Sequence, residues 1–221
     1  FGGEGSSERP AGRWYEFLFN ALATPRAAEF VQNRLSVVTF NYDRSLEQYL
    51  LTALQHTYGI PHGAAVMLAR TVAIAHVYGD LGELFDSDPD GFRDYQPSVS
   101  PSDLLVVRKR LRLIVEERTR SEYETTLQGA QARLMLSQAQ RIYFVGFAYD
   151  PLNLRRIRPE KFLHGVRINM STYGLTRAEC VTAQTRIENW LGGNAGRATI
   201  DVFDPIHKCL EFMRHAPPIS S

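Results

Sequence analysis

The chain has few cysteines, no long apolar run and no excess of charge of either sign. Only Cys180 and Cys209 occur among its 221 residues, and no C-x-x-C spacing is present. A disulfide framework or a zinc site is therefore not expected, no other metal is expected, and the reducing cytoplasm is the expected compartment. No apolar run approaches the roughly 18–20 residues that cross a bilayer, so no membrane partner is expected.

The charge balance is close to neutral, with 25 basic and 24 acidic residues and a net charge of +1. This balance argues against broad electrostatic binding to nucleic acid or to a membrane surface. The length suits one sizeable core, so we expect a single domain over residues 1–221. The first twelve residues, FGGEGSSERPAG, have neither an initiating Met nor a signal peptide. They indicate a fragment of a longer chain.

Short apolar runs alternate with segments of helical spacing along the chain. The runs predict buried strands at 35–40, 71–78, 141–148, 166–171 and 198–203. Helices are expected at 13–22, 27–33, 45–56, 63–70, 103–119, 122–140, 176–191 and 205–214, with a short one after residue 153. Ser45 and Gln48 have the spacing of a capping box, and the Asp/Pro/Ser-rich stretch 86–102 predicts a long loop. Strands separated by helices predict an α/β fold, in which a parallel sheet has helices on both faces.

Polar residues follow three of these strands, at 40–43, 77–80 and 146–150. Ligands of parallel sheets bind at the carboxyl ends of the strands, so these three ends form the candidate site. Each end also has an ordinary explanation. Asn and Asp are common in turns and helix caps, and glycines serve in turns. For Asp150, a helix cap before Pro151 is as good an explanation as a place in a pocket.

Three segments resemble, in order, the motifs of the bacterial sirtuin-like (silent-information-regulator-like) family. VVTFNYDRSLE, residues 37–47, resembles the Thr-x-Asn-Tyr-Asp segment. HVYGDLG, residues 76–82, resembles the second segment, which usually contains a His-Gly pair. IYFVGFAYDPLNL, residues 142–154, resembles Val-Gly-Tyr-Ser-x-x-Asp-Pro-Asn-Leu, and STYGLT, residues 171–176, is similar to the segment that closes the pattern. The resemblance covers about 35–175.

The resemblance implies a Rossmann-like fold that binds NAD and, in many members, hydrolysis or transfer at the nicotinamide–ribose bond. Several members act in bacterial antiphage defence by destroying NAD. Cleavage of this glycosidic bond builds positive charge on the ribose as nicotinamide leaves. A neutral amide can orient a water or a ribose oxygen at that carbon without repelling the charge. Asn41 fits this role.

The resemblance also implies contacts between NAD and further residues: Asp43, Gly79, Gly146, Phe147, Asp150 and Asn169. The Asp43 carboxylate is expected to accept a hydrogen bond from a ribose hydroxyl or to brace its turn. Gly146 would let backbone N–H groups come close to phosphate or ribose. Asn169, on the next strand, is expected to hydrogen-bond the adenine ribose.

Two features depart from the family pattern. Tyr78 stands where the family has its general base, the histidine of the His-Gly pair, and His76 lies two residues earlier on the same strand face. Both are therefore candidate catalytic residues, although a tyrosine with a pKa near ~10 is a poor base at neutral pH. The family's glycine-rich phosphate loop on a first strand is also absent. Either that strand lies upstream of this fragment, or the protein lacks it.

Three functions stay open from the sequence. The first is an NAD hydrolase, favoured over a deacylase because the four zinc-ribbon cysteines of deacylating sirtuins are absent. The second is a catalytically inactive sirtuin-like sensor or scaffold that binds NAD or a related nucleotide, which Tyr78 favours. The third is an interaction module without nucleotide. The partner is open in the same way, between a second copy of the chain and a defence-system protein.

Overall fold

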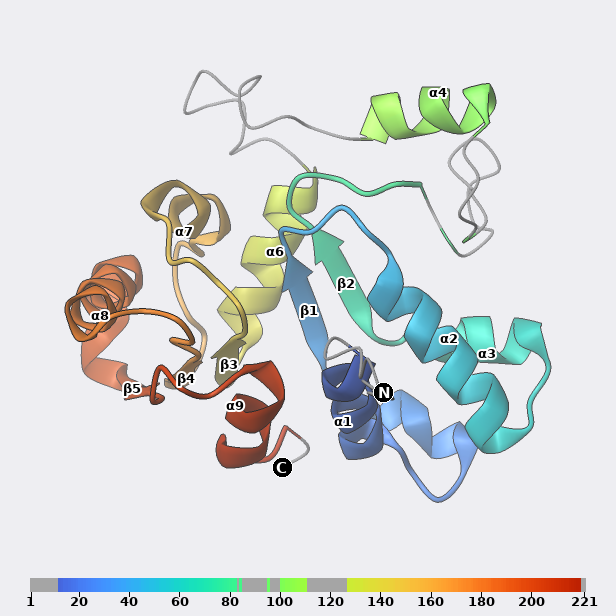
Figure 1. Cartoon of the computed structure of the whole chain (residues 1–221), viewed down its shortest axis with the longest axis horizontal. Helices are drawn as coiled ribbons and strands as arrows, with labels where there is room; N and C mark the ends of the chain where they lie inside the picture. Colours follow the sequence, from blue (N-terminus) through green and yellow to red (C-terminus); the bar gives the residue numbers. More distant parts are fainter. Residues whose placement is uncertain (1–11, 83, 85–94, 96–99, 111–126, 220–221) are drawn as a thin grey trace, which may run out of the picture.

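A computed structural model describes residues 12–82, 84, 95, 100–110 and 127–219 of the chain (Figure 1). Its strands are β1 (Ser36–Thr39), β2 (Ala73–His76), β3 (Arg141–Phe144), β4 (Val166–Met170) and β5 (Ala198–Val202). Its α-helices are α1 (Gly12–Leu22), α2 (Ser45–Tyr58), α3 (His62–Ala69), α4 (Pro101–Arg110), α6 (Leu127–Gln138), α7 (Pro151–Ile157), α8 (Arg177–Leu191) and α9 (Cys209–His215). Two 3-10 helices are η1 (Ala27–Gln32) and η2 (Gly192–Arg197).

All five predicted strands are present, and each is shorter than its apolar run. The run at 71–78 forms a strand only over Ala73–His76, because the Gly79 N–H donates to the His76 carbonyl (3.0 Å) and closes a turn. The run at 141–148 ends as a strand at Phe144. The predicted site residues after these strands therefore lie in connecting loops.

The strands form two parallel sheets rather than the single sheet expected from the sequence. β1 pairs with β2, and β3, β4 and β5 form the second sheet in that order. In the described part of the chain, no ladder joins β1 to β3. The prediction of a parallel α/β architecture is confirmed, but the predicted single sheet is divided into a two-stranded and a three-stranded sheet.

Two hydrophobic cores lie on opposite faces of these strands. The first core contains Val38 and Ile142 and packs against α6, α7 and α8. The second contains the neighbouring residues Val37 and Tyr143 and packs against α1, α2, α3 and α9. This alternation follows from the two-residue period of a strand. Since each sheet contributes to both cores, the two sheets lie in one layer with helices on both faces, as predicted.

The start of α2 differs from the prediction of a capping box at Ser45 and Gln48. The N-cap residue is Arg44, and its side chain makes no capping hydrogen bond. The Gln48 amide instead donates to the Thr52 hydroxyl (3.2 Å), one turn further along the helix. The capping-box prediction at α2 is therefore wrong. A capping box does occur at α8, where Thr176 and Glu179 cap each other.

The segment between β2 and β3 is only partly described. Most of the expected loop at 86–102 lies outside the described residues, and α4 begins at Pro101, within that predicted loop. Of the helices predicted at 103–119 and 122–140, the described residues contain the parts that belong to α4 and α6. No helix in the described ranges combines the length and apolarity that crossing a membrane requires.

Candidate functional site

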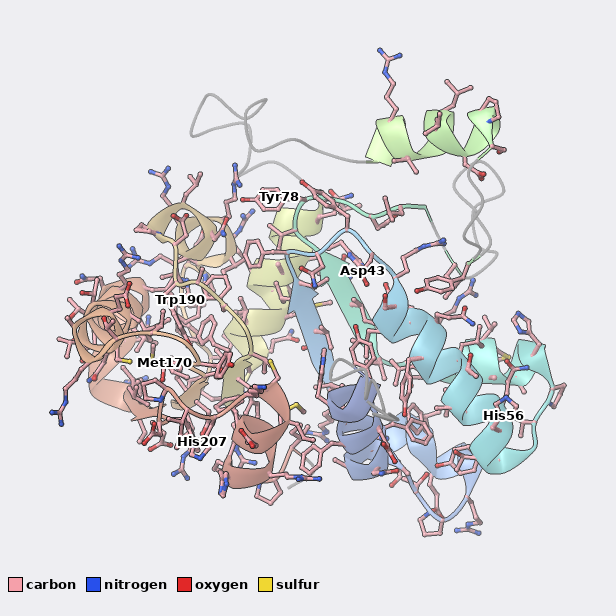
Figure 2. The ribbon with its side chains drawn as sticks, in the orientation of Figure 1. Asp43, His56, Tyr78, Met170, Trp190 and His207 are labelled. Carbon is pink, nitrogen blue, oxygen red and sulfur yellow. The ribbon has the colours of Figure 1, made fainter. Side chains whose placement is uncertain are left out.

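The ends of β1, β2 and β3 meet at one edge of the strand layer. The ring of Phe40, after β1, lies 5.7 Å from the ring of Tyr78, after β2, and 5.3 Å from that of Phe147, after β3 (centroid distances). The Tyr78 hydroxyl donates to Oδ1 of Asn153 in α7 (2.6 Å). Figure 2 labels Tyr78 and Asp43 near the carboxyl ends of β1 and β2. The structure thus brings together the three strand ends that the sequence singled out.

Asn41 and Asp43 lie in the exposed turn between β1 and α2. The Asn41 backbone N–H donates to the Thr39 hydroxyl (3.1 Å). The Asp43 carboxylate accepts from the Ser45 N–H (3.1 Å), which is the turn-bracing contact that the sequence left open for it. The Asp43 carboxylate is therefore used within the turn, whereas the side chain of Asn41 stays exposed at the strand-end edge.

His76 lies behind this turn and is hydrogen-bonded through both ring nitrogens. Its Nδ1 lies 2.8 Å from the carbonyl oxygen of Asn41, and its Nε2 lies 2.6 Å from Oε1 of Glu47 in α2. His76 is 7% exposed and Glu47 is 9% exposed. A carbonyl oxygen only accepts, so Nδ1 carries a proton, and an ionised Glu47 requires a second proton on Nε2. In this arrangement neither ring nitrogen faces a substrate.

The surroundings of His76 favour the charged imidazolium. Burial by itself lowers the pKa of His76. The hydrogen bond and charge of Glu47, the Asn41 carbonyl and the charge of Asp80 outweigh burial, so the pKa of His76 is raised above its ordinary value.

This raised pKa predicts that the folded chain loses stability as the pH rises. A histidine with a folded-state pKa above its unfolded value of about 6.5 contributes fully at pH below 6.5. That contribution disappears as the pH rises through the raised folded-state pKa of His76. We expect urea midpoints measured between pH 6 and pH 9 to fall with increasing pH, and the fall to be smaller in Glu47→Gln. Equal slopes in the two proteins would contradict this assignment.

Tyr78, the other candidate base, is buried and its hydroxyl is already engaged. Besides donating to Asn153, the hydroxyl oxygen accepts a hydrogen bond from Nη1 of Arg156. The Arg156 guanidinium lies over the Tyr78 ring, 4.6 Å from its centroid, and Arg156 is only 3% exposed. The Tyr78 side chain therefore joins the end of β2 to α7.

The loop after β3 contains three of the predicted cofactor-binding residues. Gly146 has φ of 59°, and a Cβ there would lie 3.8 Å from Sγ of Cys209, an ordinary contact. The positive φ, rather than close packing, therefore favours glycine at this position. Asp150 is the N-cap of α7 and accepts from the N–H groups of Leu152 and Asn153 (2.9 and 3.1 Å), so its alternative interpretation as a helix cap is confirmed. Phe147 packs against the first core.

Gly79 and Asn169 complete the set of predicted residues. Gly79 closes the turn after β2 with φ of 81°. Asn169 lies within β4 and is fully buried, and its Nδ2 donates to the Ile142 carbonyl over 3.5 Å. Within the described residues, its Oδ1 and the buried Ser171 hydroxyl have no hydrogen-bond partner. The structure thus places Asn169 inside the sheet, whereas Asn41 lies in an exposed turn.

Sequence reasoning missed four polar residues around this edge: Glu47, Asn153, Arg156 and Ser171. One of them carried a signal. Glu47 precedes Leu50, Leu51 and Leu54 by three, four and seven residues, and this spacing places it on the buried face of α2. A carboxylate on such a face indicates a buried partner. His76 is that partner.

The strand-end edge presents amide, aromatic and backbone groups. In the described ranges, no group of three or more His, Cys, Asp or Glu side chains could hold a metal, and Cys180 and Cys209 are free thiols. The edge offers instead an exposed amide, aromatic rings and backbone turns with positive φ. No protein-family model, curated protein or solved structure that was compared with the chain matches it.

Proposed function

We propose that the chain is a sirtuin-like domain that binds NAD at the carboxyl edge of its parallel strands and hydrolyses the nicotinamide–ribose bond. The observation that carries this proposal is the convergence of the three strand ends, with the amide of Asn41 exposed at their edge. An edge of this kind is where parallel α/β sheets bind ligands. The Ser171 hydroxyl at the end of β4, which has no hydrogen-bond partner among the residues that the structure describes, adds a polar group that a ribose or phosphate can satisfy.

The reaction needs little from the protein beyond orientation. The bond between the ribose C1′ and the nicotinamide nitrogen breaks, and its electron pair leaves with nicotinamide. The oxygen of a water molecule bonds to C1′, and its proton passes to solvent, giving ADP-ribose. Because the transition state resembles an oxocarbenium ion, the amide of Asn41 can orient the water without adding charge.

The test is release of nicotinamide from NAD by the purified chain. We expect Asn41→Ala to lower the rate by about 100-fold, the effect of losing one orienting group in an active site. NAD affinity, measured by calorimetry, should change far less. Asn20→Ala is the matched control, because Asn20 is an exposed asparagine on α1. An equal rate in wild type and Asn41→Ala would contradict the role of Asn41.

A second candidate is binding of NAD or a related nucleotide without turnover, as in a sensor or scaffold. Its specific support is that both candidate bases are engaged, His76 through two nitrogens and Tyr78 through its hydroxyl. Calorimetry and nicotinamide release separate the two functions. Binding with no release supports the sensor, and absence of binding contradicts both.

A further inference from the structure

A buried line of hydrogen bonds runs from α2, through β2, to the exposed turn of the proposed site. The Glu47 carboxylate accepts a hydrogen bond from His76 Nε2 (2.6 Å), and the Asn41 carbonyl accepts one from His76 Nδ1 (2.8 Å). Glu47 lies in α2, Asn41 in the turn that precedes α2, and His76 in β2, which meets the other two only in the folded chain. The line ends on the backbone of the one residue whose side chain is assigned to the reaction.

The Asn41 backbone is fixed from both sides. Its N–H donates to Thr39 Oγ1 (3.1 Å), and its carbonyl accepts from His76. Fixing both groups of a turn residue restricts its φ and ψ, and so sets the direction of its Cα–Cβ bond and limits the rotamers of its side chain. The backbone from which the exposed amide extends is therefore held by a buried support, although the turn itself lies at the surface.

We propose that Glu47 and His76 are positioning residues for Asn41. This inference rests on the proposed function, since it assigns the support of the same site. Neither residue touches the substrate: His76 fixes the Asn41 carbonyl, and Glu47 fixes the His76 ring with Nδ1–H toward that carbonyl. When His76 loses its second proton, its Nε2 lone pair faces the Glu47 carboxylate. Repulsion between them turns the ring and releases Asn41.

Several charged or titratable groups surround this line, and they come from different elements. Asp80, after β2, acts on His76, and Tyr15, in α1, lies near Glu47 and Asp43. Arg44, at the N-cap of α2, is buried and lies three residues before Glu47 in the chain. Among these groups, Glu47 alone bonds the His76 ring through its side chain. Neutralising Glu47 therefore has the largest effect on the protonation of His76.

The experiment compares wild type with Glu47→Gln in two measurements. Imidazole NMR gives the pKa of His76, and the pH profile of kcat/KM for nicotinamide release gives the descending limb of activity. In Glu47→Gln we expect the pKa of His76 and the descending limb of kcat/KM to move together toward lower pH. A movement of about one unit lowers kcat/KM about tenfold at pH values above both limbs. Glu29→Gln, which removes the carboxylate of the surface pair with Arg26, is the matched control and should change neither.

Failure of this inference and failure of the proposed function give different results. A His76 pKa that moves while the limb of kcat/KM stays in place overturns the positioning role, even if NAD is cleaved. If wild type releases no nicotinamide, the proposed function fails by itself. The positioning role is then read from the Asn41 carbonyl carbon by NMR. A shift that follows the His76 titration supports it, and a shift independent of that titration overturns it.

Discussion

Replacing His76 by leucine is expected to lower the free energy of unfolding by about 3–5 kcal/mol, the range for breaking a buried ion pair. The carboxylate of Glu47 then stays at a site where it is 9% exposed and has lost its partner, so it must be desolvated without compensation. Urea unfolding followed by circular dichroism measures the loss.

The matched comparison is the double variant in which Glu47→Met accompanies His76→Leu. Because apolar residues of similar volume can replace a buried pair at little cost, the double variant should be more stable than His76→Leu alone. If instead the two substitutions add, the carboxylate and the imidazole do not interact in the folded chain.

Truncation of Phe144 to alanine should cost about 3–5 kcal/mol, the range for removing a buried aromatic ring. Phe144 ends β3, is 6% exposed, and its ring lies 5.3 Å from that of Phe147, 5.7 Å from that of Tyr149 and 5.9 Å from that of Trp190. Its removal leaves a cavity in the first core, next to the Phe147 ring of the loop that contains Gly146. Thermal unfolding and urea unfolding both report the loss.

Val181→Ala serves as the control for this truncation, because Val181 is 62% exposed on α8 and its shortening should stay within about 0.5 kcal/mol. Phe144→Leu should lose an amount of stability between those of Phe144→Ala and Val181→Ala, since leucine refills part of the volume of the ring. A loss below about 1 kcal/mol in Phe144→Ala would mean that the four rings do not form one packed group.

The strands and their direction followed from the sequence because their apolar runs are short and β-rich. The run of Val37, Val38 and Thr39 has this character, and it forms β1. The division into two sheets could not be predicted, because local pattern says which segments are strands and not which strands pair. The failed cap at Ser45 has a similar cause. The spacing from Ser45 to Gln48 was correct, but the helix begins one residue earlier than the cap requires, so that Ser45 is its first residue and Arg44 is its N-cap.

The candidate site was predicted as a set of strand ends, and its internal contacts were not. The sequence placed Asn41, His76 and Tyr78 at neighbouring ends, and the structure brings these ends together. The spacing of α2 indicates that Glu47 is buried, but it does not identify His76 as its partner, and nothing local points to Asn153 or Arg156. The three contacts join residues 29, 75 and 78 positions apart in the chain. Such long-range pairs depend on tertiary packing, which no local spacing encodes.

The division of the strand layer has a consequence for local unfolding. The ladder of β1 and β2 and the ladder of β3, β4 and β5 are coupled through side-chain packing, so either can open without breaking the backbone bonds of the other. A two-stranded ladder is the weaker unit, and its amides should exchange with solvent first. A ligand at the shared edge touches loops from both ladders. Because the ligand binds only when both ladders are formed, its binding free energy stabilises them together and suppresses this opening.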